Sequence, residues 1–361
     1  MMEDINNLMM GLGIALQGYN ILIAVIGLVL GIIVGVLPGL GGANGVAILI
    51  PVVVTMTPVT GVILLSSIYW GALYGGSITS ILFNIPGEPW SVATTFDGYP
   101  MAKSGKAGKA LVLSFLSHGV GGAVGVVLLT FFAPVIAEFA LKFGPAEIFS
   151  VMLLTFSAFV GLSGKSPLKN VIAILFGFIL AAVGMDIISG QLRMTYGSVV
   201  LMGGFNFVVA VIGLFGLGEI FLTVEEGLKV EGIVARVGLK DIREGMKEII
   251  RYPKALIIGT LVGCWMGLKP GGATPASFMA YGFIKQSSAN KDEFGKGAPA
   301  GIIAPEAAAH GAGTSATLPM ITLGIPGSPT MAVIMGGLMI FGLQPGPMLF
   351  KEHADFVWGL I

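Results

Sequence analysis

Apolar residues run along this chain in long blocks that only a few polar stretches interrupt. No Asp, Glu, Lys or Arg occurs between Ile5 and Gly87, and none occurs between Ala307 and Phe350. A helix needs about 20 apolar residues to cross a bilayer, so each block can hold several membrane segments. The pattern therefore predicts a polytopic membrane protein built of helices.

The apolar blocks divide into segments at polar or Pro/Gly-rich positions. A mildly apolar N-terminal stretch, residues 1–18, is expected to be an interfacial helix, and the first span is expected at residues 20–37. Further apolar segments follow at residues 59–85, 110–137, 147–163, 168–185, 194–218, 255–268, 298–323 and 331–350. The first of these is expected to break at Gly75, Gly76 and Ser77. Another apolar stretch begins at Phe356, so we expect further C-terminal spans in a longer protein.

Two Pro-Gly motifs interrupt the apolar sequence in the same order in two halves of the chain. The first motif, G-x3-G-x2-P-G, stands at Gly31, Gly35, Pro38 and Gly39 and returns at Gly263, Gly267, Pro270 and Gly271. The second motif, I-P-G-x-P, occupies residues 85–89 and 325–329. The apolar segments that follow the first motif, residues 43–57 and 272–284, are too short for ordinary spans and suggest half-length helices.

Breaks at membrane depth leave backbone groups without water, so they persist only where protein buries them or where they line a wet cavity. Paired breaks in corresponding segments are typical of transporters built from internal repeats. The alternative is that Gly and Pro are simply frequent in membrane helices. We predict an all-α membrane protein with two inverted-topology repeats and broken or re-entrant helices: residues 1–222, a polar and cytoplasmic linker at 223–254, and residues 255–361, truncated at the C-terminus.

Charge and composition exclude several other classes. Only 11% of residues are charged, and 19 Lys and Arg balance 19 Asp and Glu, so nothing indicates nucleic-acid binding. No Walker string is present, which disfavours ATP-driven transport by this chain. The histidines, His118, His310 and His353, are far apart in sequence and lack metal-site spacing. Cys264 is expected to pack as a small apolar residue.

The distribution of Lys and Arg predicts an orientation. Positive charge gathers at residues 88–109, 165–169 and 223–254, whereas the N-terminus carries acidic residues and no basic n-region of a cleavable signal peptide. By the positive-inside rule, the N-terminus is expected outside and the 223–254 linker in the cytoplasm.

Several strings resemble the large membrane subunit of the tripartite tricarboxylate transporters. They are GVLPGLGGANGVAILIP, YWGALYGGSITSILFNIPGEPWSVATTFDGYPMAKSGKAGKAL, FGPAEIF, FGKGAPAGIIAPEAA, TLGIPGSP and GLQPGPMLF. The resemblance covers residues 31–359 and rests on many separate strings, and members of the family are longer than this chain. Two departures stand beside the expected site: Lys269 replaces an apolar residue, and Ala309 and His310 stand where the family often has two asparagines.

The resemblance implies a secondary transporter in the bacterial inner membrane. Such a subunit works with a small membrane subunit and with a periplasmic binding protein that delivers the substrate. Family substrates are mostly carboxylates, such as citrate, other di- and tricarboxylates or aromatic acids. A gradient of sodium or protons is expected to drive uptake, and no other cofactor is expected. The residues alone leave two alternatives: a passive channel, and a membrane-embedded enzyme acting on a lipid-like substrate, which would need clustered intramembrane Asp, Glu or His.

A carboxylate at membrane depth needs hydrogen-bond donors, and the N-termini of half-helices supply them. We expect the breaks to start such half-helices, with small polar side chains nearby that donate without a net charge. Unwound carbonyls near Gly39, Gly87, Gly271 and Gly327 are candidate sodium ligands. The predicted substrate-binding residues are Pro38, Gly39, Gly41, Asn44, Ser77, Thr79, Asn84, Pro86, Gly87, Lys269, Pro270, Gly271, Thr274, Ser277, His310, Thr314, Ser315, Pro326, Gly327 and Ser328, with Thr317 beside them. For any single Ser or Thr, the alternative is a bond to its own helix carbonyl.

The ionisable candidates each have a structural alternative. Lys269 is either a counter-ion for a substrate carboxylate or a side chain that reaches a nearby interface. His310 either binds substrate or relays a proton, or else bonds a carbonyl in the core. Glu306 either caps a helix or takes part in cation coupling. Asp97 and Glu88 are expected to structure the loop after the first I-P-G.

Overall fold

The structure is a computed structural model of the chain. It describes residues 2–37, 40–142, 144, 146, 147, 149, 150, 152, 153, 156, 157, 167–185, 191–205, 221, 224, 225, 233, 235–269 and 271–361. Pro38, Gly39 and Pro270 lie outside the described residues, as do most of the segments predicted at 147–163 and 194–218.

The first part of the chain is a series of helices. They are α1 (Met2–Ala15), α2 (Gly18–Val36), α3 (Gly41–Val53), α4 (Pro58–Phe83), the short η1 (Pro89–Ser91), α5 (Val92–Met101), the π-helical η2 (Ala102–Lys106) and α6 (Ala107–Ala140). The α4 helix begins where the Thr57 hydroxyl accepts a hydrogen bond from the Thr60 N–H, and it ends at Asn84 in the left-handed conformation. The break predicted at residues 75–77 is wrong, because α4 continues through these positions.

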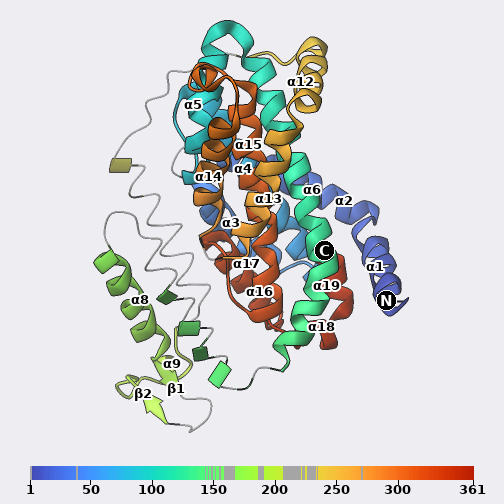
Figure 1. Cartoon of the computed structure of the whole chain (residues 1–361). Coiled ribbons are helices and arrows are strands. Elements are labelled where there is room, and N and C mark those ends of the chain that lie inside the picture. Colours follow the sequence, from blue (N-terminus) through green and yellow to red (C-terminus); the bar gives the residue numbers. More distant parts are fainter. Residues whose placement is uncertain are drawn as a thin grey trace.

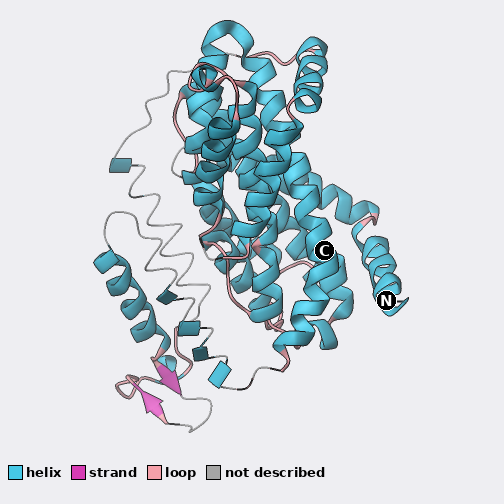
Figure 2. Ribbon diagram, in the orientation of Figure 1, coloured by secondary structure: helices cyan, strands magenta, loops and turns pink. Residues whose placement is uncertain are grey.

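The middle of the chain holds α8 (Pro167–Ala181), two short strands, β1 (Gly184–Met185) and β2 (Leu192–Arg193), and α9 (Val199–Met202). The strands pair antiparallel, with Gly184 opposite Arg193. Figure 2 shows this small sheet beside an otherwise helical fold. The described residues are otherwise helical and fit the all-α class, but the helix predicted at residues 168–185 ends at Ala181.

The C-terminal part is again helical. It comprises α12 (Leu239–Arg251), α13 (Pro253–Gly267), α14 (Ala273–Ser287), η4 (Lys291–Glu293), α15 (Pro299–Ser315), α16 (Thr317–Leu323), α17 (Pro329–Ile340), α18 (Leu349–Glu352) and α19 (Ala354–Leu360). The segment predicted to run to residue 350 stops at Ile340. There Gly342 takes a φ of 76°, and Pro345 and Pro347 follow, so the helix cannot continue.

The helical content and the exposed apolar surface fit a membrane protein. Within the described residues, three helical stretches are long and apolar enough to cross a bilayer: Gly18–Val36, Pro58–Phe83 and Pro89–Ala140. The bent pair α12 and α13, at 78°, would add a fourth. Large apolar side chains lie exposed on the outer faces of α2 and α6, including Val25, Ile33, Phe131 and Phe139. The predicted helical membrane protein is confirmed.

Two helix pairs, α2 with α4 and α13 with α15, pack in the same way in the two halves. A side chain on Gly31 or Gly35 would overlap the carbonyl oxygens of Ile68 and Ala72 in α4. A side chain on Gly263 or Gly267 would overlap those of Ala308 and Ala312 in α15. The leading glycines of the G-x3-G-x2-P-G motif therefore allow close backbone contact.

The two short helices pack reciprocally across the halves. The α3 helix of the first half packs against α17, which follows the second I-P-G, and α14 packs against η1, which follows the first. The Ser277 hydroxyl in α14 donates to the Trp90 carbonyl in η1 at 2.8 Å. Figure 1 shows α13, α15 and α6 side by side in the same helical body. Each half-length helix is thus held by the other half of the chain.

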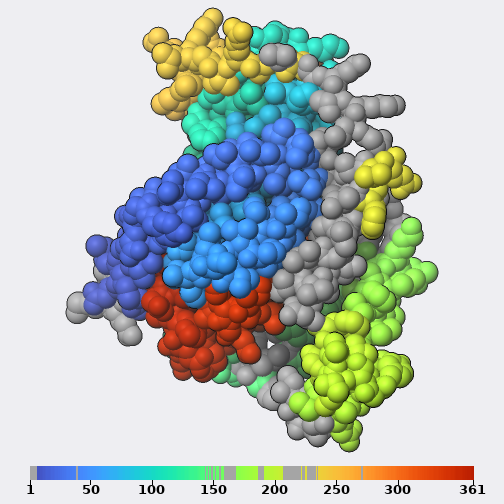
Figure 3. All heavy atoms as spheres, turned by 180° about the vertical axis from the view of Figure 1, so that it is seen from behind, coloured from blue at the N-terminus to red at the C-terminus, as the bar shows by residue number. Residues whose placement is uncertain are grey.

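The two ends of the chain share one face. The α1 helix packs against α19, and a side chain on Gly11 would overlap the Trp358 carbonyl. Figure 3 shows the N-terminal helices in blue directly beside the C-terminal elements in red.

Candidate transport site

The second I-P-G folds back onto the second Pro-Gly break. The Gly271 N–H donates to the Gly327 carbonyl at 2.7 Å, and Gly271 takes a φ of 74°, which favours glycine. In the first half, the Gly87 N–H lies 3.4 Å from the Gly76 carbonyl, and a side chain on Gly87 would lie 2.7 Å from the Gly35 carbonyl oxygen. Gly87, Gly271 and Gly327 therefore have close backbone neighbours. Pro86 is exposed, and Pro326 is half-buried.

Each I-P-G is preceded by a residue in the left-handed conformation, Asn84 with a φ of 58° and Gly324 with a φ of 69°. Asparagine tolerates this conformation better than most residues. Asn84 is exposed, so the structure gives it a role in the backbone turn and does not place it with the buried polar groups.

A carboxylate of the chain itself stands at the start of α3. The Glu88 side chain accepts a hydrogen bond from the Gly42 N–H. Gly41, with a φ of 63°, lies directly beside this carboxylate. Glu88 thus holds a half-helix N-terminus that the sequence assigned to a substrate carboxylate. The corresponding position of the second half is Ser328, whose hydroxyl accepts from the Met331 N–H at 3.2 Å and caps α17.

The predicted polar side chains of the site divide into two groups, those with a hydrogen-bond or sulfur contact that explains them and those that are simply buried. Thr79 donates to the carbonyl of Gly76 in its own helix, Ser277 bridges to η1, and Thr317 contacts the Met331 sulfur. These bonds are structural, and Thr274 is half-buried. Asn44, Ser77, Thr314 and Ser315, by contrast, are buried polar residues along α3, α4 and α15. The Thr314 hydroxyl has no hydrogen-bond partner among the described residues.

Glu306 is buried and lies in the interior of α15, so the capping interpretation is wrong. Its Oε1 accepts a hydrogen bond from the Thr94 hydroxyl in α5. Its Oε2 accepts from the Ser114 hydroxyl in α6 at 2.6 Å and lies 3.1 Å from Nε2 of His118. The Ser77 side chain in α4 also lies beside it.

His118 lies beside this carboxylate, and its ring contacts the ring of His310, which is 192 positions further along the chain. Their ring centroids are 4.9 Å apart, and the Nδ1 atoms of both rings are buried without a partner among the described residues. His310 packs on Gly122 of α6. Trp70 and Tyr74 of α4 contact His310 and His118, respectively. Sequence spacing alone did not reveal this contact, because it joins α6 to α15.

Asp97 holds the loop that precedes α15. Its Oδ1 accepts the N–H groups of Gly295, Gly297 and Ala298 at 2.9, 2.9 and 2.8 Å. The Tyr281 hydroxyl donates to Oδ2 at 3.0 Å. Asp97 is fully buried, so it structures a loop of the second half and not only the loop beside its own I-P-G.

Lys269 lies apart from these groups. Its side chain is exposed, and its ammonium nitrogen lies 5.2 Å from the centre of the Trp265 ring, which is 64% exposed. This arrangement fits a lysine that reaches outwards along an aromatic side chain.

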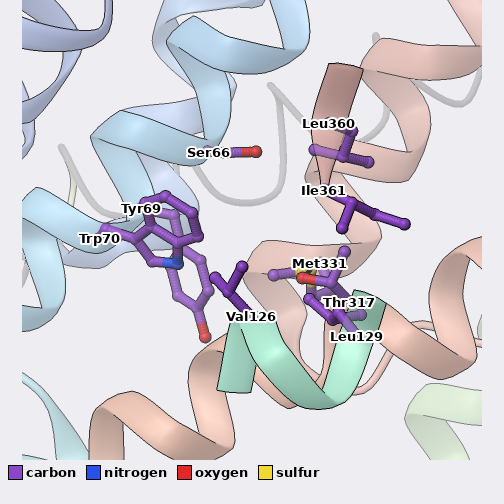
Figure 4. A pocket seen from close by; sticks show the side chains of 9 residues that line it. All are labelled: Ser66, Tyr69, Trp70, Val126, Leu129, Thr317, Met331, Leu360 and Ile361. Carbon is purple, nitrogen blue, oxygen red and sulfur yellow. Dashed lines mark hydrogen bonds between the residues drawn. The ribbon is translucent and has the colours of Figure 1, made fainter. Parts of the chain in front are cut away.

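A small pocket lies between the two halves, next to Tyr69. Figure 4 shows Tyr69 and Trp70 from α4 facing Thr317 and Met331, with Val126 and Leu129 from α6 beneath them. The buried Tyr69 hydroxyl lies beside Ser328 and Glu88. The described residues hold no group of three or more His, Cys, Asp or Glu side chains arranged for a metal ion.

Apolar helices with exposed apolar outer faces define a polytopic helical membrane protein. The comparisons with known proteins name its family: the sequence pattern of the tripartite tricarboxylate transporter TctA family matches residues 21–361. The chain belongs to this family, which is the large-subunit family of a tripartite transport system.

Two relatives come from Agrobacterium vitis. An uncharacterized 52.8 kDa protein in the TAR-I ttuC' 3' region is 41% identical over 362 residues, which covers 100% of this chain and 72% of the relative. An uncharacterized protein in the TAR-II ttuC' 3' region is 40% identical over 100 residues, covering 27% of this chain and 41% of that relative. No solved structure matches the chain.

Proposed function

We propose that this chain is the subunit that moves a carboxylate across the bacterial inner membrane, driven by a sodium or proton gradient. The carrying observation is the family match over residues 21–361 on a fold whose halves repeat the same pair of breaks. In this proposal a periplasmic binding protein delivers the substrate, and a small membrane subunit completes the transporter. The substrate is a tricarboxylate, a dicarboxylate or an aromatic acid.

In this proposal the substrate site lies between the two halves, with buried polar groups contributed by α3, α4 and α15. Asn44, Ser77, Thr314 and Ser315 supply uncharged donors, and backbone near Gly87, Gly271 and Gly327 supplies carbonyls for a cation. Desolvating a carboxylate requires such donors, since an unpaired charge in an apolar interior is very costly. The reciprocal packing of α3 and α14 across the halves supports two repeats of opposite orientation that move against the remaining helices.

The enzyme alternative required clustered intramembrane acidic or imidazole groups, and Glu306, His118 and His310 form such a cluster. The family assignment favours transport over catalysis. The passive channel gains no support from any specific contact.

The test is uptake by cells or right-side-out vesicles that hold the full chain, its small membrane subunit and the binding protein. Radiolabelled citrate, succinate and benzoate serve as probes, with and without collapse of the sodium or proton gradient. We expect accumulation of at least one probe against its gradient and loss of accumulation on collapse. Equilibration without accumulation would indicate a channel.

A matched pair of variants tests the site. Thr314→Ala removes a buried hydroxyl that has no partner among the described residues, whereas Thr322→Ala removes a buried hydroxyl that donates to its own helix at Leu318. We expect Thr314→Ala to raise the KM for uptake and Thr322→Ala to leave it unchanged. Equal effects of the two variants would remove Thr314 from the site.

A further inference from the structure

We infer that Glu306, His118 and His310 form a protonation site that couples transport to the proton gradient. This inference rests on the proposed transport function, and it assigns the coupling ion and its residues. The three side chains come from α6 and α15, and the hydroxyls that hold the carboxylate come from α5 and α6. Elements from both parts of the chain therefore meet at one buried acid.

The carboxylate is buried without a permanent positive charge beside it. Glu306 is 1% exposed, and within the described residues His118 is its one ion-pair partner. Moving an unneutralised carboxylate into an apolar interior is costly, and a histidine neutralises it only when a proton is bound. The cluster gains a net charge when it releases its proton and loses that charge when it binds one, as a coupling site requires.

The imidazoles supply a route for the proton. His118 is 3% exposed, and its Nε2 lies 3.1 Å from Oε2 of Glu306, but neither of its ring nitrogens makes a hydrogen bond within the described residues. The His310 ring lies beside it, and its Nδ1 is also buried and unpartnered. Leaving a buried polar nitrogen without a partner destabilises the fold, so these atoms are suited to bind a water molecule or to accept a transferred proton.

The proposed proton transfer neither creates nor loses a proton at any step. A proton from the water-filled side binds Nδ1 of His118, directly or from His310. His118 then gives the proton on its Nε2 to Oε2 of Glu306, so the histidine returns to neutral and the carboxyl becomes uncharged. The reverse sequence on the opposite side releases one proton. No electron is transferred, and no covalent bond other than N–H and O–H changes.

The other titratable groups near α15 have partners or lie on other faces. Five helices packed against α15 carry further titratable residues. These residues are Tyr69 and Tyr74 on α4, Asp97 and Tyr99 on α5, Lys109 and Glu138 on α6, Lys254 and Cys264 on α13, and Tyr281 and Lys285 on α14. Glu88 precedes η1, which also packs against α15. Asp97 is held by backbone N–H groups and Tyr281, and Lys109 pairs with Glu248 at 2.7 Å. Tyr74 stacks edge-on with His118 and is therefore in contact with the cluster.

The ligand atoms favour a proton over sodium at this position. Sodium prefers a shell of oxygens, and an imidazole is a poor ligand for such a hard cation. The carboxylate oxygens already accept hydrogen bonds from two hydroxyls, and one ring nitrogen lies 3.1 Å from Oε2. A proton needs only the nitrogen and the carboxylate oxygen.

The first test is an infrared titration of the full chain, purified with its small membrane subunit in nanodiscs. We expect the wild type to show the carbonyl band of a protonated buried carboxylic acid, which disappears as the pH rises. Glu306→Gln is expected to lose this band. Persistence of the whole band in that variant would overturn the inference. Loss of the wild-type band on addition of sodium at constant pH would also overturn it.

A second pair of variants keeps the test valid if Glu306→Gln fails to fold. Ser114 and Ser117 are both fully buried on α6, but Ser114 donates to Glu306 and Ser117 donates to the Leu113 carbonyl. Ser114→Ala removes a donor from the ionised carboxylate, so the titration midpoint is expected to move to higher pH. Ser117→Ala is expected to leave it in place. Equal midpoints for both variants would contradict the site.

Uptake separates failure of the inference from failure of the proposed function. With citrate, succinate and benzoate as probes, we expect Glu306→Gln and His118→Gln to lose accumulation driven by a pH gradient. Accumulation that sodium alone drives, unchanged in both variants, would overturn the proton site and leave the transport function standing. An intact infrared titration in a protein that accumulates no probe would leave the site standing and count against the proposed function.

Discussion

The α2–α4 and α13–α15 pairs share one scaffold, but the groups beside their breaks differ. Glycines at equivalent motif positions allow the same close backbone packing in both halves. In the first half a carboxylate, Glu88, holds the start of α3, and α4 runs without interruption. In the second half a hydroxyl, Ser328, caps α17, and the long helix is divided between α15 and α16.

The shared motifs therefore specify the backbone packing, while the polar and charged side chains beside them differ between the two halves. Glycine and proline determine where helices approach and end, and these positions are the same in both halves. The titratable cluster is not repeated: Glu306 and His310 lie on α15, and His118 lies on α6, while Trp70 and Tyr74 of α4 contact His310 and His118, respectively. A repeated backbone scaffold can therefore hold a cluster of titratable groups that occurs only once among the described residues.

The largest expected effect comes from filling the close helix contacts. Gly31→Val and Gly263→Val would each drive a side chain into a backbone carbonyl of the partner helix. Overpacking typically costs about 1–3 kcal/mol and more where backbone must move, so we expect little folded protein from either variant. Gly13→Val and Gly282→Val, which meet open space, are the controls. Fluorescence-detected size exclusion measures the yield of folded protein. A normal yield for only one of the two variants would show that the two helix pairs are not equivalent.

The next effect concerns the carboxylate that ties the first half to the second. Asp97→Ala leaves three loop N–H groups and the Tyr281 hydroxyl without their acceptor. A hydrogen bond to a charged group is worth about 1.5–3 kcal/mol, so we expect a clear drop in the thermal unfolding midpoint. Asp292→Ala, at an exposed position of η4, is the control. An unchanged midpoint in Asp97→Ala would mean that the loop is held by other contacts.

A smaller effect distinguishes Glu88 from Ser328. Ser328→Ala removes a helix cap, which costs about 1 kcal/mol. Glu88→Ala removes an acceptor at the start of α3 together with a negative charge at a helix N-terminus, which adds about 0.3–1 kcal/mol to a comparable loss. We therefore expect Glu88→Ala to lower the unfolding midpoint more than Ser328→Ala does. The reverse order would show that the two positions are not comparable in the folded protein.

The smallest effect is expected at Lys269. Its exposed ammonium would act on an anionic substrate through the surrounding field, and salt screens such a field over about 10 Å at 0.1 M ionic strength. Lys269→Ala is expected to slow uptake of citrate modestly at low ionic strength and not at high ionic strength. A loss that persists at high salt would instead indicate direct contact with the substrate. The control is Lys285→Ala, which removes a basic residue in the last turn of α14.

Much of the fold could be predicted from the residues. Apolar segments predicted α2, α6 and α13 closely, and their Pro-Gly ends predicted the short helices α3 and α14. The prediction failed where Gly75 and Gly76 looked like a break, because tertiary contacts with α2 keep α4 helical there. It also failed after Ile340, where apolar composition concealed a turn built on Gly342 and two prolines.

Less of the candidate site could be predicted. The sequence offers helix capping or cation coupling for Glu306, but its neighbours Thr94, Ser114 and His118 come from elements far away in sequence. Spacing rules describe neighbours on one helix, and they carry no information on which faces of α5, α6 and α15 meet. Lys269 stood out because a lysine is rare in apolar sequence, yet side-chain length let it turn outwards to Trp265.

The bonds of Asp97 have a consequence for biosynthesis. Of the backbone groups that donate to it, the first in the sequence is the Gly295 N–H, 198 positions further along the chain. While the ribosome makes the intervening segments, this acid has no native partner and must stay at the membrane surface or in water. The first half therefore cannot complete its packing when it enters the membrane, and it has to wait for the loop before α15. Expression of residues 1–222 and 235–361 as separate polypeptides should show this directly, since Asp97 would reach its native environment only when both pieces are made together.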